Sequence, residues 1–398
     1  MKYAVVLPDG AADVAIAELD GRTPLESAQT PYMDWIARHG RQGCVLTVPD
    51  GFTSGTDVAT LSLLGYDPKA SYSGQASFEA TARGLTIAED QLVFRCNYVT
   101  VEDGLMRDYT ADHITQPEAD ELIADLNALF ADEPFEFHAG SSYRNLMVAS
   151  NASRMRPTCQ APHDISNQPV ADYMPTGSGS DQIRSVMARA SMLLARHPVN
   201  AARIQAGRRP VTHIWLWGQG GPTLLESFAE RFGYLGAVIA GADIIRGLAA
   251  CAGMRLIDVP GATGGLDTDY RGKGRAALEA MEDFDLVLVH IAAPDVAGHR
   301  GDAGAKVEAL ERIDDLIVGP LLQALRQCPA WRILVAPDHA TLLTTRAHSR
   351  VPPPFCCAGR NIEPLEKEPF CEAHAGHSGL YIRPGHDLMG LFMRGRFD

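Results

Sequence analysis

Three apolar runs of the sequence end in a proline that is followed at once by an aspartate. These aspartates are Asp9 after AVVLP, Asp295 after LVLVHIAAP and Asp338 after ILVAP. Proline has no backbone N–H and ends sheet pairing, so each carboxylate is expected just beyond a strand. In a parallel α/β sheet the three would share the edge at which such folds bind ligands. One Pro-Asp pair is typical of an ordinary turn, so only the grouping indicates chemistry.

Histidines accompany two of these aspartates. His299 follows Asp295 by four residues, so one helical turn would place both on the same side, and His339 follows Asp338 directly. A further histidine, His348, lies in the proline-rich segment RAHSRVPPPF. Aspartate and histidine without cysteine are typical ligands of Mn, Mg, Zn or Co. Two such ions can bind the attacking and leaving oxygens of a phosphoryl transfer. Each histidine alone would be an ordinary surface or core residue.

A threonine stands where an apolar, helix-like run begins. Thr56 follows Gly55 in TSGTDVATLSLLGY. A helix N-terminus offers N–H groups and a favourable dipole to a phosphate. A hydroxyl there becomes a nucleophile if a metal ion also lowers its pKa. The simpler interpretation is that Thr56 only caps the helix.

The elements around these residues predict an α/β fold with a doubly wound, mainly parallel sheet. The expected strands are 3–7, 44–48, 213–217, 285–291, 332–336 and 380–383, and the expected helices are 24–39, 57–64, 181–197, 222–232, 241–252, 272–283 and 304–327. Residues 86–175 differ, with short apolar runs around one helix at 117–130, and the Gly-, Ser- and Pro-containing segment 172–181 follows. We therefore expect a main domain of residues 1–85 and 176–398 and a smaller inserted α+β cap of residues 86–175.

Composition restricts the class of function. A chain of 398 residues with 46% hydrophobic residues supports a large core. The formal net charge of −14 disfavours nucleic acid or an anionic membrane surface as a partner. The first apolar run, in MKYAVVLPDG, is too short for a signal segment or a membrane span. We expect a cytoplasmic protein that acts on a small phosphorylated molecule, and the oligomeric state stays open.

Taken together, the motifs resemble the archaeal-type, cofactor-independent (2,3-bisphosphoglycerate-independent) phosphoglycerate mutases of the alkaline phosphatase superfamily. The resemblance covers nearly the whole chain. It rests on LPDGAAD at 8–14, GRTPLESAQTPYMD at 21–34, SGTDVATLSLLGYDP at 54–68, FRCN at 94–97, GLDTDYRGKGRAAL at 265–278, APDVAGHRGD at 293–302, PDHATLL at 337–343 and HSRVPPPF at 348–355. It implies a phosphatase-like main domain with two divalent ions, for which manganese is preferred over magnesium, zinc or cobalt.

By position, the resemblance also assigns roles to single residues. One metal ion is assigned to Asp9, Thr56, Asp338 and His339, and the other to Asp295, His299 and His348. Substrate contacts are assigned to Lys273 on the main domain and to Arg95, Asn97, Arg144 and His163 on the insert. The chain departs from the family at two positions, because Thr56 replaces the phosphorylated serine and Asn145 replaces a usual histidine. Threonine keeps the hydroxyl but adds a methyl group that restricts χ1.

The resemblance therefore implies a phosphoglycerate mutase. Thr56 would take the phosphoryl group from 3-phosphoglycerate and return it to the 2-hydroxyl of glycerate, and closure of the cap would exclude water. Three alternatives stay open: a related phosphotransferase such as a homoserine kinase, a metal-dependent phosphomonoesterase, and a non-catalytic phosphate-binding relic. His374 and His377, in EAHAGHSGLY, are further potential ligands, although a loop packed near the site is the simpler interpretation.

Overall fold

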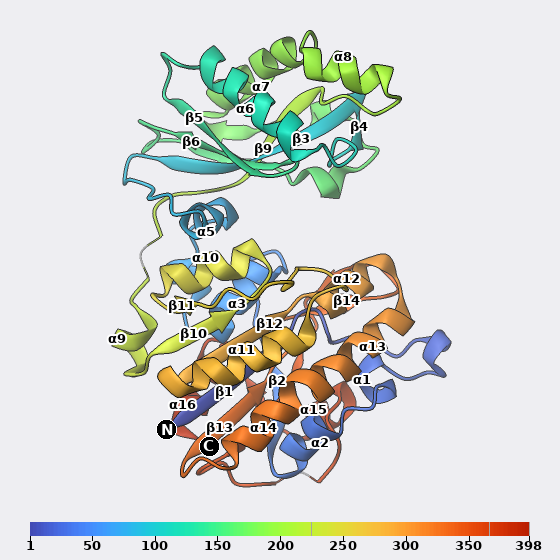
Figure 1. Ribbon diagram of the computed structural model, residues 1–398, viewed down its shortest axis with the longest axis vertical. Helices are drawn as coiled ribbons and strands as arrows, with labels where there is room; N and C mark the ends of the chain where they lie inside the picture. The colour runs from blue at the N-terminus through green and yellow to red at the C-terminus, as the bar shows by residue number, and fades with distance from the viewer. Residues whose placement is uncertain (224, 366, 398) are drawn as a thin grey trace. The chain divides into compact units, whose positions relative to one another are not determined.

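The chain folds into two compact units. The structure is a computed structural model, and it describes all residues except 224, 366 and 398. The main unit comprises Met1–Tyr72 and Leu224–Asp398, and the inserted unit comprises Ser73–Thr223 (Figure 1). The predicted insert, residues 86–175, was therefore too short at both ends. No helix of the described residues combines the length and the apolar character that a membrane span requires.

The main unit is built on a mainly parallel sheet, as the sequence predicted. In the described residues the sheet has eight strands in the order β11-β10-β12-β1-β13-β16-β2-β17. Strand β16 runs opposite to its neighbours β13 and β2, and the other pairs are parallel. The strands are β1 (Lys2–Pro8), β2 (Gly40–Val45), β10 (Gly236–Ile239), β11 (Arg255–Leu256), β12 (Leu286–Ile291), β13 (Trp331–Val335), β16 (Pro354–Gly359) and β17 (Tyr381–Ile382).

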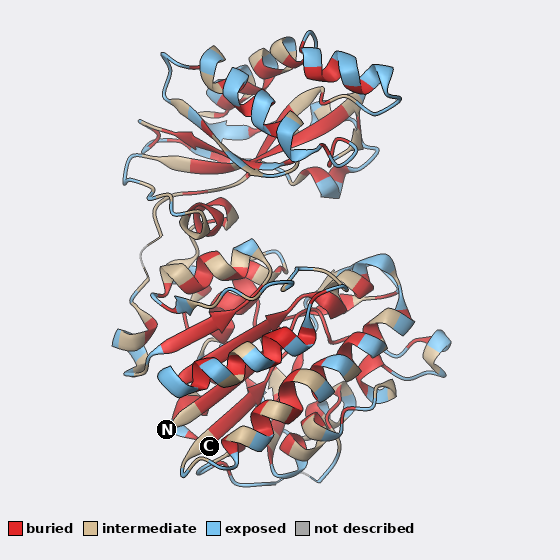
Figure 2. Ribbon diagram, viewed as in Figure 1, coloured by how far each residue is buried: buried red, intermediate tan, exposed pale blue. Residues whose placement is uncertain are grey.

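Helices cover both faces of this sheet, and its central strands are buried (Figure 2). Alternate residues of β1 point to opposite faces. Val6 belongs to the core that includes residues of α2 (Pro31–Arg38), α11 (Tyr270–Asp283), α13 (Ala303–Ile313) and α14 (Gly319–Leu325). The Tyr3 hydroxyl instead donates to the Met393 carbonyl on α16 (Asp387–Arg394), which packs against α3 (Thr56–Leu63). Smaller helices of this unit are α1 (Pro24–Ser27), α4 (Pro68–Ser71), α9 (Phe228–Phe232), α10 (Asp243–Cys251), α12 (Ala293–Arg300) and α15 (Glu372–His377).

Several predicted elements differ from the observed ones for local reasons. The expected helix 24–39 is two helices, because Pro31 starts a new helix after Thr30. The expected helix 304–327 changes to a π-helical segment at Asp314–Val318 before α14 begins. Strand β16 was not predicted, because its prolines resembled a loop.

The inserted unit is an antiparallel sheet with helices on both faces. Its described strands have the order β4-β3-β6-β5. Strand β9 also pairs with β3, outside this order. These strands are β3 (Leu92–Glu102), β4 (Leu105–Asp108), β5 (Phe135–Ser141), β6 (Arg144–Ala149) and β9 (His213–Gly220), with β7 (Arg156–Thr158) and β8 (Thr176–Ser178) forming a separate pair. Its helices are α5 (Gln75–Ala82), α6 (Gln116–Leu129), α7 (Ser180–Leu194) and α8 (Pro198–Gln205).

The core of this unit explains why the predicted boundary at 175 was wrong. Ile183 and Met187 of α7 and Ile214 and Trp215 of β9 pack into one cluster with Phe94 of β3. The predicted boundary at residue 175 places α7 and β9 in the main domain instead. An apolar strand next to an amphipathic helix fits either sheet by pattern alone, and only the pairing of β9 with β3 decides between them.

Candidate metal centre and active site

The three aspartates lie at one edge of the main sheet, beyond β1, β12 and β13. Asp9 directly follows β1, and its backbone N–H donates to the Ile291 carbonyl at the end of β12 (3.0 Å). The Gly10 N–H donates to Asp338 Oδ1 (3.1 Å). Asp295 is the third residue of α12, which begins at Ala293 and has Pro294 in its first turn. The prediction of a shared edge is therefore confirmed.

Asp295, His299 and His348 form one group of potential ligands. Asp295 Oδ1 lies 3.4 Å from His299 Nε2 and 3.3 Å from His348 Nε2, and the two Nε2 atoms are 3.0 Å apart. The Nδ1 atom of His299 contacts the Arg346 carbonyl (2.9 Å), and that of His348 contacts the Ser54 carbonyl (3.1 Å). A carbonyl only accepts, so each Nδ1 carries a proton, and each Nε2 would offer its lone pair to a metal ion when the ring is neutral. Three acceptors that converge in this way fit a cation.

Asp9, Asp338 and His339 form a second group, and all three are buried. His339 Nε2 lies 3.3 Å from Asp9 Oδ1 and 3.5 Å from Asp338 Oδ2. Asp338 Oδ2 is buried and has no hydrogen-bond partner in the described part of the chain. A buried carboxylate oxygen without a donor is costly unless a cation is bound to it. This group therefore also has the chemistry of a divalent-metal site.

Thr56 lies beside the second group. It is the first residue of α3, and the N-cap is Gly55, which has no side-chain cap. The Thr56 hydroxyl lies 3.1 Å from His339 Nε2 and 3.4 Å from Asp9 Oδ1. The hydroxyl is thus directed at two potential ligands, and the interpretation of Thr56 as a simple cap is not supported.

Thr341 connects the two groups, and it was not predicted as a site residue. Its hydroxyl donates to Asp295 Oδ1 (2.5 Å) and lies 3.2 Å from His339 Nδ1. Thr341 is on β14 (Ala340–Leu342), directly opposite His348 on β15 (Ala347–Ser349). Gly10, at φ 62°, leaves room for this hydroxyl, because a Cβ there would lie 2.5 Å from it. Thr341 is part of the PDHATLL motif, but nothing in its residue type or spacing indicated this role.

The carboxylates of the two groups influence one another electrostatically. Burial and the negative charges of Asp338 and Asp295 raise the pKa of Asp9 well above its usual value. Burial also opposes ionisation of Asp295, but its hydrogen bond with His348 and the charges of the neighbouring histidines hold its pKa below the usual range. Burial lowers the pKa of His339, which favours the neutral ring that a metal requires. Bound cations would relieve the repulsion at Asp9.

Lys273 lies on α11 and is fully buried. Its ammonium donates to the His290 carbonyl (3.0 Å), and burial lowers its pKa to about 8. His290 Nε2 in turn lies 3.3 Å from Asp9 Oδ2, and burial lowers the pKa of His290 to about 4. His290 therefore lies between Lys273 and the Asp9 carboxylate. His290 belongs to a strand and was not predicted as a site residue.

The other residues assigned to substrate lie on the inserted unit, and three of them surround Trp217. The Arg95 guanidinium stacks 4.1 Å above the Trp217 ring and pairs with Glu79 (3.1 Å). Asn97 Oδ1 accepts a hydrogen bond from Trp217 Nε1 (3.1 Å), and the His163 ring lies 5.2 Å from the Trp217 ring. The structure thus brings these three residues together. Trp217 was missed, because a buried tryptophan on a strand usually belongs to a core.

Arg144 and Asn145 begin the neighbouring strand β6. Arg144 is exposed, lies opposite Asn97 in the sheet register, and places its guanidinium 4.4 Å from the Tyr143 ring. Asn145 is buried, and its Oδ1 accepts a hydrogen bond from the Gly140 N–H (2.9 Å). In this position Asn145 stabilises the turn between β5 and β6.

His374 and His377 take no part in the two groups. They lie on α15, and His374 Nδ1 contacts the Pro369 carbonyl (2.9 Å). Neither histidine is among the clustered potential metal ligands of the described residues. The structure therefore gives no support for these histidines as ligands.

Known proteins resemble this chain over nearly its whole length. A family model described as 2,3-bisphosphoglycerate-independent phosphoglycerate mutase matches residues 37–200. A relative of that name from Methanothrix thermoacetophila is 45% identical over 99% of this chain and 100% of its own. The structure of PH0037 protein from Pyrococcus horikoshii is 28% identical and has a TM-score of 0.82, covering 99% of this chain and 96% of its own.

A second solved structure carries a functional name. It is a cofactor-independent phosphoglycerate mutase from Thermoplasma acidophilum, with 25% identity and a TM-score of 0.66, and the match covers 99% of each chain. The match to the Methanothrix relative covers 99% of this chain and therefore spans both of its units. The chain belongs to the 2,3-bisphosphoglycerate-independent phosphoglycerate mutase family.

Proposed function

We propose that the protein interconverts 3-phosphoglycerate and 2-phosphoglycerate through a phospho-Thr56 intermediate that depends on two divalent metal ions. The names of its relatives support the reaction. The observation that carries the mechanism is the Thr56 hydroxyl, which lies 3.1 Å from His339 Nε2 and 3.4 Å from Asp9 Oδ1 at the start of a helix. A hydroxyl so placed has both a polar environment for its activation and backbone N–H groups to receive a phosphate.

The ligand sets follow the two groups described above. Asp9, Thr56, Asp338 and His339 would hold one ion, and Asp295, His299 and His348 would hold the other. When bound, the ions would neutralise phosphate charge and lower the pKa of the attacking hydroxyl. Manganese is our first choice, with magnesium, zinc and cobalt as alternatives, because oxygen and imidazole ligands without thiolates suit all four.

The transfer steps and the substrate contacts are assigned to single residues of the chain. Thr56 Oγ1 loses its proton and forms a bond to phosphorus, while the bond from phosphorus to the 3-oxygen of glycerate breaks and that oxygen takes up a proton. The first N–H groups of α3 donate hydrogen bonds to the phosphoryl oxygens. The 2-hydroxyl of the reoriented glycerate then attacks phospho-Thr56. Glycerate must be held meanwhile by its carboxylate, which we assign to Arg95 and Arg144, since guanidinium binds carboxylate through two parallel hydrogen bonds. Lys273 would add positive charge behind the phosphate.

A direct assay tests this proposal. Purified protein with Mn²⁺ is given 3-phosphoglycerate, and 2-phosphoglycerate is measured through a coupled enolase reaction. Parallel reactions contain homoserine with a phosphate donor, or a generic aryl phosphate. Formation of 2-phosphoglycerate at a rate far above that of phosphate release is expected. Phosphorylation of homoserine without mutase activity would replace the proposal by the kinase alternative, and release of phosphate alone would replace it by the phosphomonoesterase.

A further inference from the structure

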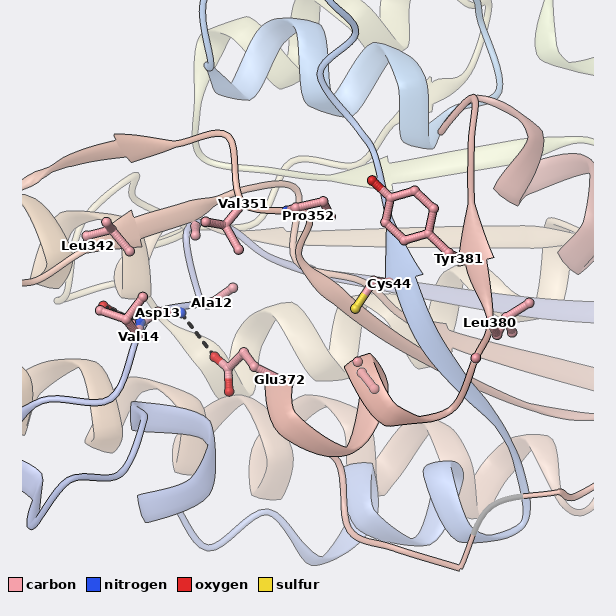
Figure 3. A pocket seen from close by; sticks show the side chains of 14 residues that line it. Ala12, Asp13, Val14, Cys44, Leu342, Val351, Pro352, Glu372, Leu380 and Tyr381 are labelled. Atoms are coloured by element: carbon pink, nitrogen blue, oxygen red, sulfur yellow. Dashed lines mark hydrogen bonds between the residues drawn. The ribbon is translucent and has the colours of Figure 1, made fainter.

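The main unit contains a cavity that none of the potential metal ligands lines. Its volume is about 380 Å³, which is within the range of small-molecule sites. Figure 3 shows that it lies between the loop after β1, the β14 segment and α15. The apolar part of the lining consists mainly of Val14, Leu342, Val351, Pro352, Leu380 and Tyr381. This space is therefore separate from the proposed mutase chemistry.

The rim of the cavity is unusually apolar for a protein surface. Val14 is 39% exposed, Tyr381 is 49% exposed and Val351 is 52% exposed. These three are among only eight large hydrophobic residues that the described part of the chain exposes. Apolar side chains that gather at the mouth of a hollow indicate a binding site, because a ligand that covers them removes apolar surface from water.

The cavity also has a distinct charge character. Its ionisable lining groups are Asp13, Glu372, Cys44 and Tyr381, and no lysine, arginine or histidine is among the lining residues. Asp13 is neutralised by Lys306, whose ammonium lies 2.7 Å from Asp13 Oδ2. Burial raises the pKa of the Cys44 thiol, so Cys44 contributes a neutral wall. An anionic phosphoester would find no positive partner here, which excludes the proposed substrate from this site.

Glu372 is the polar group left for a ligand. Its Oε1 accepts a hydrogen bond from the Asp13 N–H (3.0 Å), which Figure 3 shows. Its Oε2 accepts one from the Thr23 hydroxyl (2.7 Å). Each carboxylate oxygen has a further lone pair available. Among the described residues Glu372 has no ion-pair partner within 4.0 Å, and burial raises its pKa to about 7, so an ammonium group bound beside it would favour the ionised carboxylate.

We propose that this cavity binds a small organic amine, whose hydrocarbon part contacts the apolar lining and whose ammonium pairs with Glu372. A charged hydrogen bond in a partly buried site is stronger than a neutral one, so the ammonium gives selectivity and the apolar wall gives contact area. The site goes beyond the proposed mutase reaction and does not depend on it. It lies beside Ala12 and Ala340, which follow the metal-group residues Asp9 and His339 in the chain.

The test uses three probes that each carry a phenyl group on a short alkyl chain and differ in the charge of their polar group. The full-length, metal-loaded protein is titrated by calorimetry with 2-phenylethylamine, 2-phenylethanol and phenylacetate. The amine is expected to bind at least tenfold more tightly than the alcohol, and phenylacetate is expected to show no binding. Glu372→Gln should reduce the affinity for the amine to that for the alcohol. The control Glu363→Gln removes an exposed acid outside the cavity and should leave all three affinities unchanged.

A second variant separates this cavity from other places where an amine could bind. Gly376 lines the cavity, and a Cβ added there meets no atom within 4 Å, so Gly376→Leu should fill space without unfolding the protein. It should abolish binding of both the amine and the alcohol while the melting temperature is retained. Binding that survives Gly376→Leu would overturn the proposal, as would equal affinities for the amine and the alcohol. A concentration-dependent dimer that Tyr381→Ser dissociates would assign the rim to a second copy of the chain instead.

Discussion

Replacing Lys273 by methionine should make the metal-free protein more stable at neutral pH and less active when metal is restored. The Lys273 side chain is fully buried, and its ammonium has the His290 carbonyl as its hydrogen-bond acceptor. Among the described residues it forms no ion pair with a carboxylate within 4.0 Å. Methionine has nearly the same length and volume, so the substitution removes a buried charge without opening a cavity.

The magnitude follows from the pKa of Lys273. Burial lowers it from 10.5 to about 8, so between these values the unfolded chain holds the proton and the folded chain does not. The free energy of unfolding therefore rises with pH in that window, and below pH 8 the charged amine costs the folded state about 3 kcal/mol. The His290 carbonyl loses a hydrogen bond in Lys273→Met, which costs about 1 kcal/mol. The variant should thus be about 2 kcal/mol more stable than wild type at pH 7, and it should become less stable than wild type above about pH 10.

The assay is urea unfolding of chelated wild type and variant from pH 7 to pH 10.5, followed by the mutase assay with Mn²⁺. We expect turnover to fall at least tenfold, because positive charge near Asp9 is lost. Lys306→Met is the matched control: Lys306 is also buried but pairs with Asp13 (2.7 Å), so its loss should destabilise the protein by about 3 kcal/mol or more. Equal destabilisation by both substitutions at pH 7 would refute this account of Lys273.

The remaining predictions concern the metal groups and the nucleophile. Chelation should abolish mutase activity and lower the melting temperature, and Mn²⁺ should restore both; full activity of verified metal-free protein would contradict the two-ion proposal. Thr56→Val should reduce turnover by roughly 100-fold or more with little change in melting temperature, whereas Thr56→Ser should stay active, as phosphate trapping on residue 56 would show. Thr341→Val should weaken Mn²⁺ binding about 10-fold in calorimetry, because it releases Asp295 and His339. Arg144→Ala should raise the ratio of released phosphate to 2-phosphoglycerate formed, since glycerate would escape before phosphate returns to it.

The metal groups could be predicted from the sequence because each ligand depends on a local rule. Proline ends a strand and places Asp9 or Asp338 beyond it, and these rules act within a few residues. Asp295 and His299 are one helical turn apart, and the structure confirms both the helix and the contact between them (3.4 Å). His348 was a candidate from its residue type and its proline-rich segment, but its assignment to one of the two ions came from the resemblance, because its position depends on the β14–β15 hairpin.

The parts that could not be predicted depend on contacts between distant segments. Thr341 connects Asp295 and His339 only because β14 and β15 pair and place it at the site. The extent of the inserted unit depends on the pairing of β9 with β3, about 120 residues earlier in the chain. Hydrophobic pattern predicts that β9 is a strand, but it carries no information about the partner of that strand.

The distribution of buried positive charge indicates how the main unit keeps its carboxylates available for metal ions. Lys306 is fully buried close to the site, yet it donates to the Ala12 carbonyl (3.2 Å), the Thr341 carbonyl (2.7 Å) and Asp13 Oδ2 (2.7 Å). It therefore joins the loop after Asp9 to the strand after His339 through their backbones. Asp9 and Asp338 have no lysine or arginine partner among the described residues within 4.0 Å. Lys306 thus fixes the two loops without neutralising Asp9 and Asp338. The charge of these two carboxylates stays available to metal ions that bind from solution, as a preorganised metal site requires.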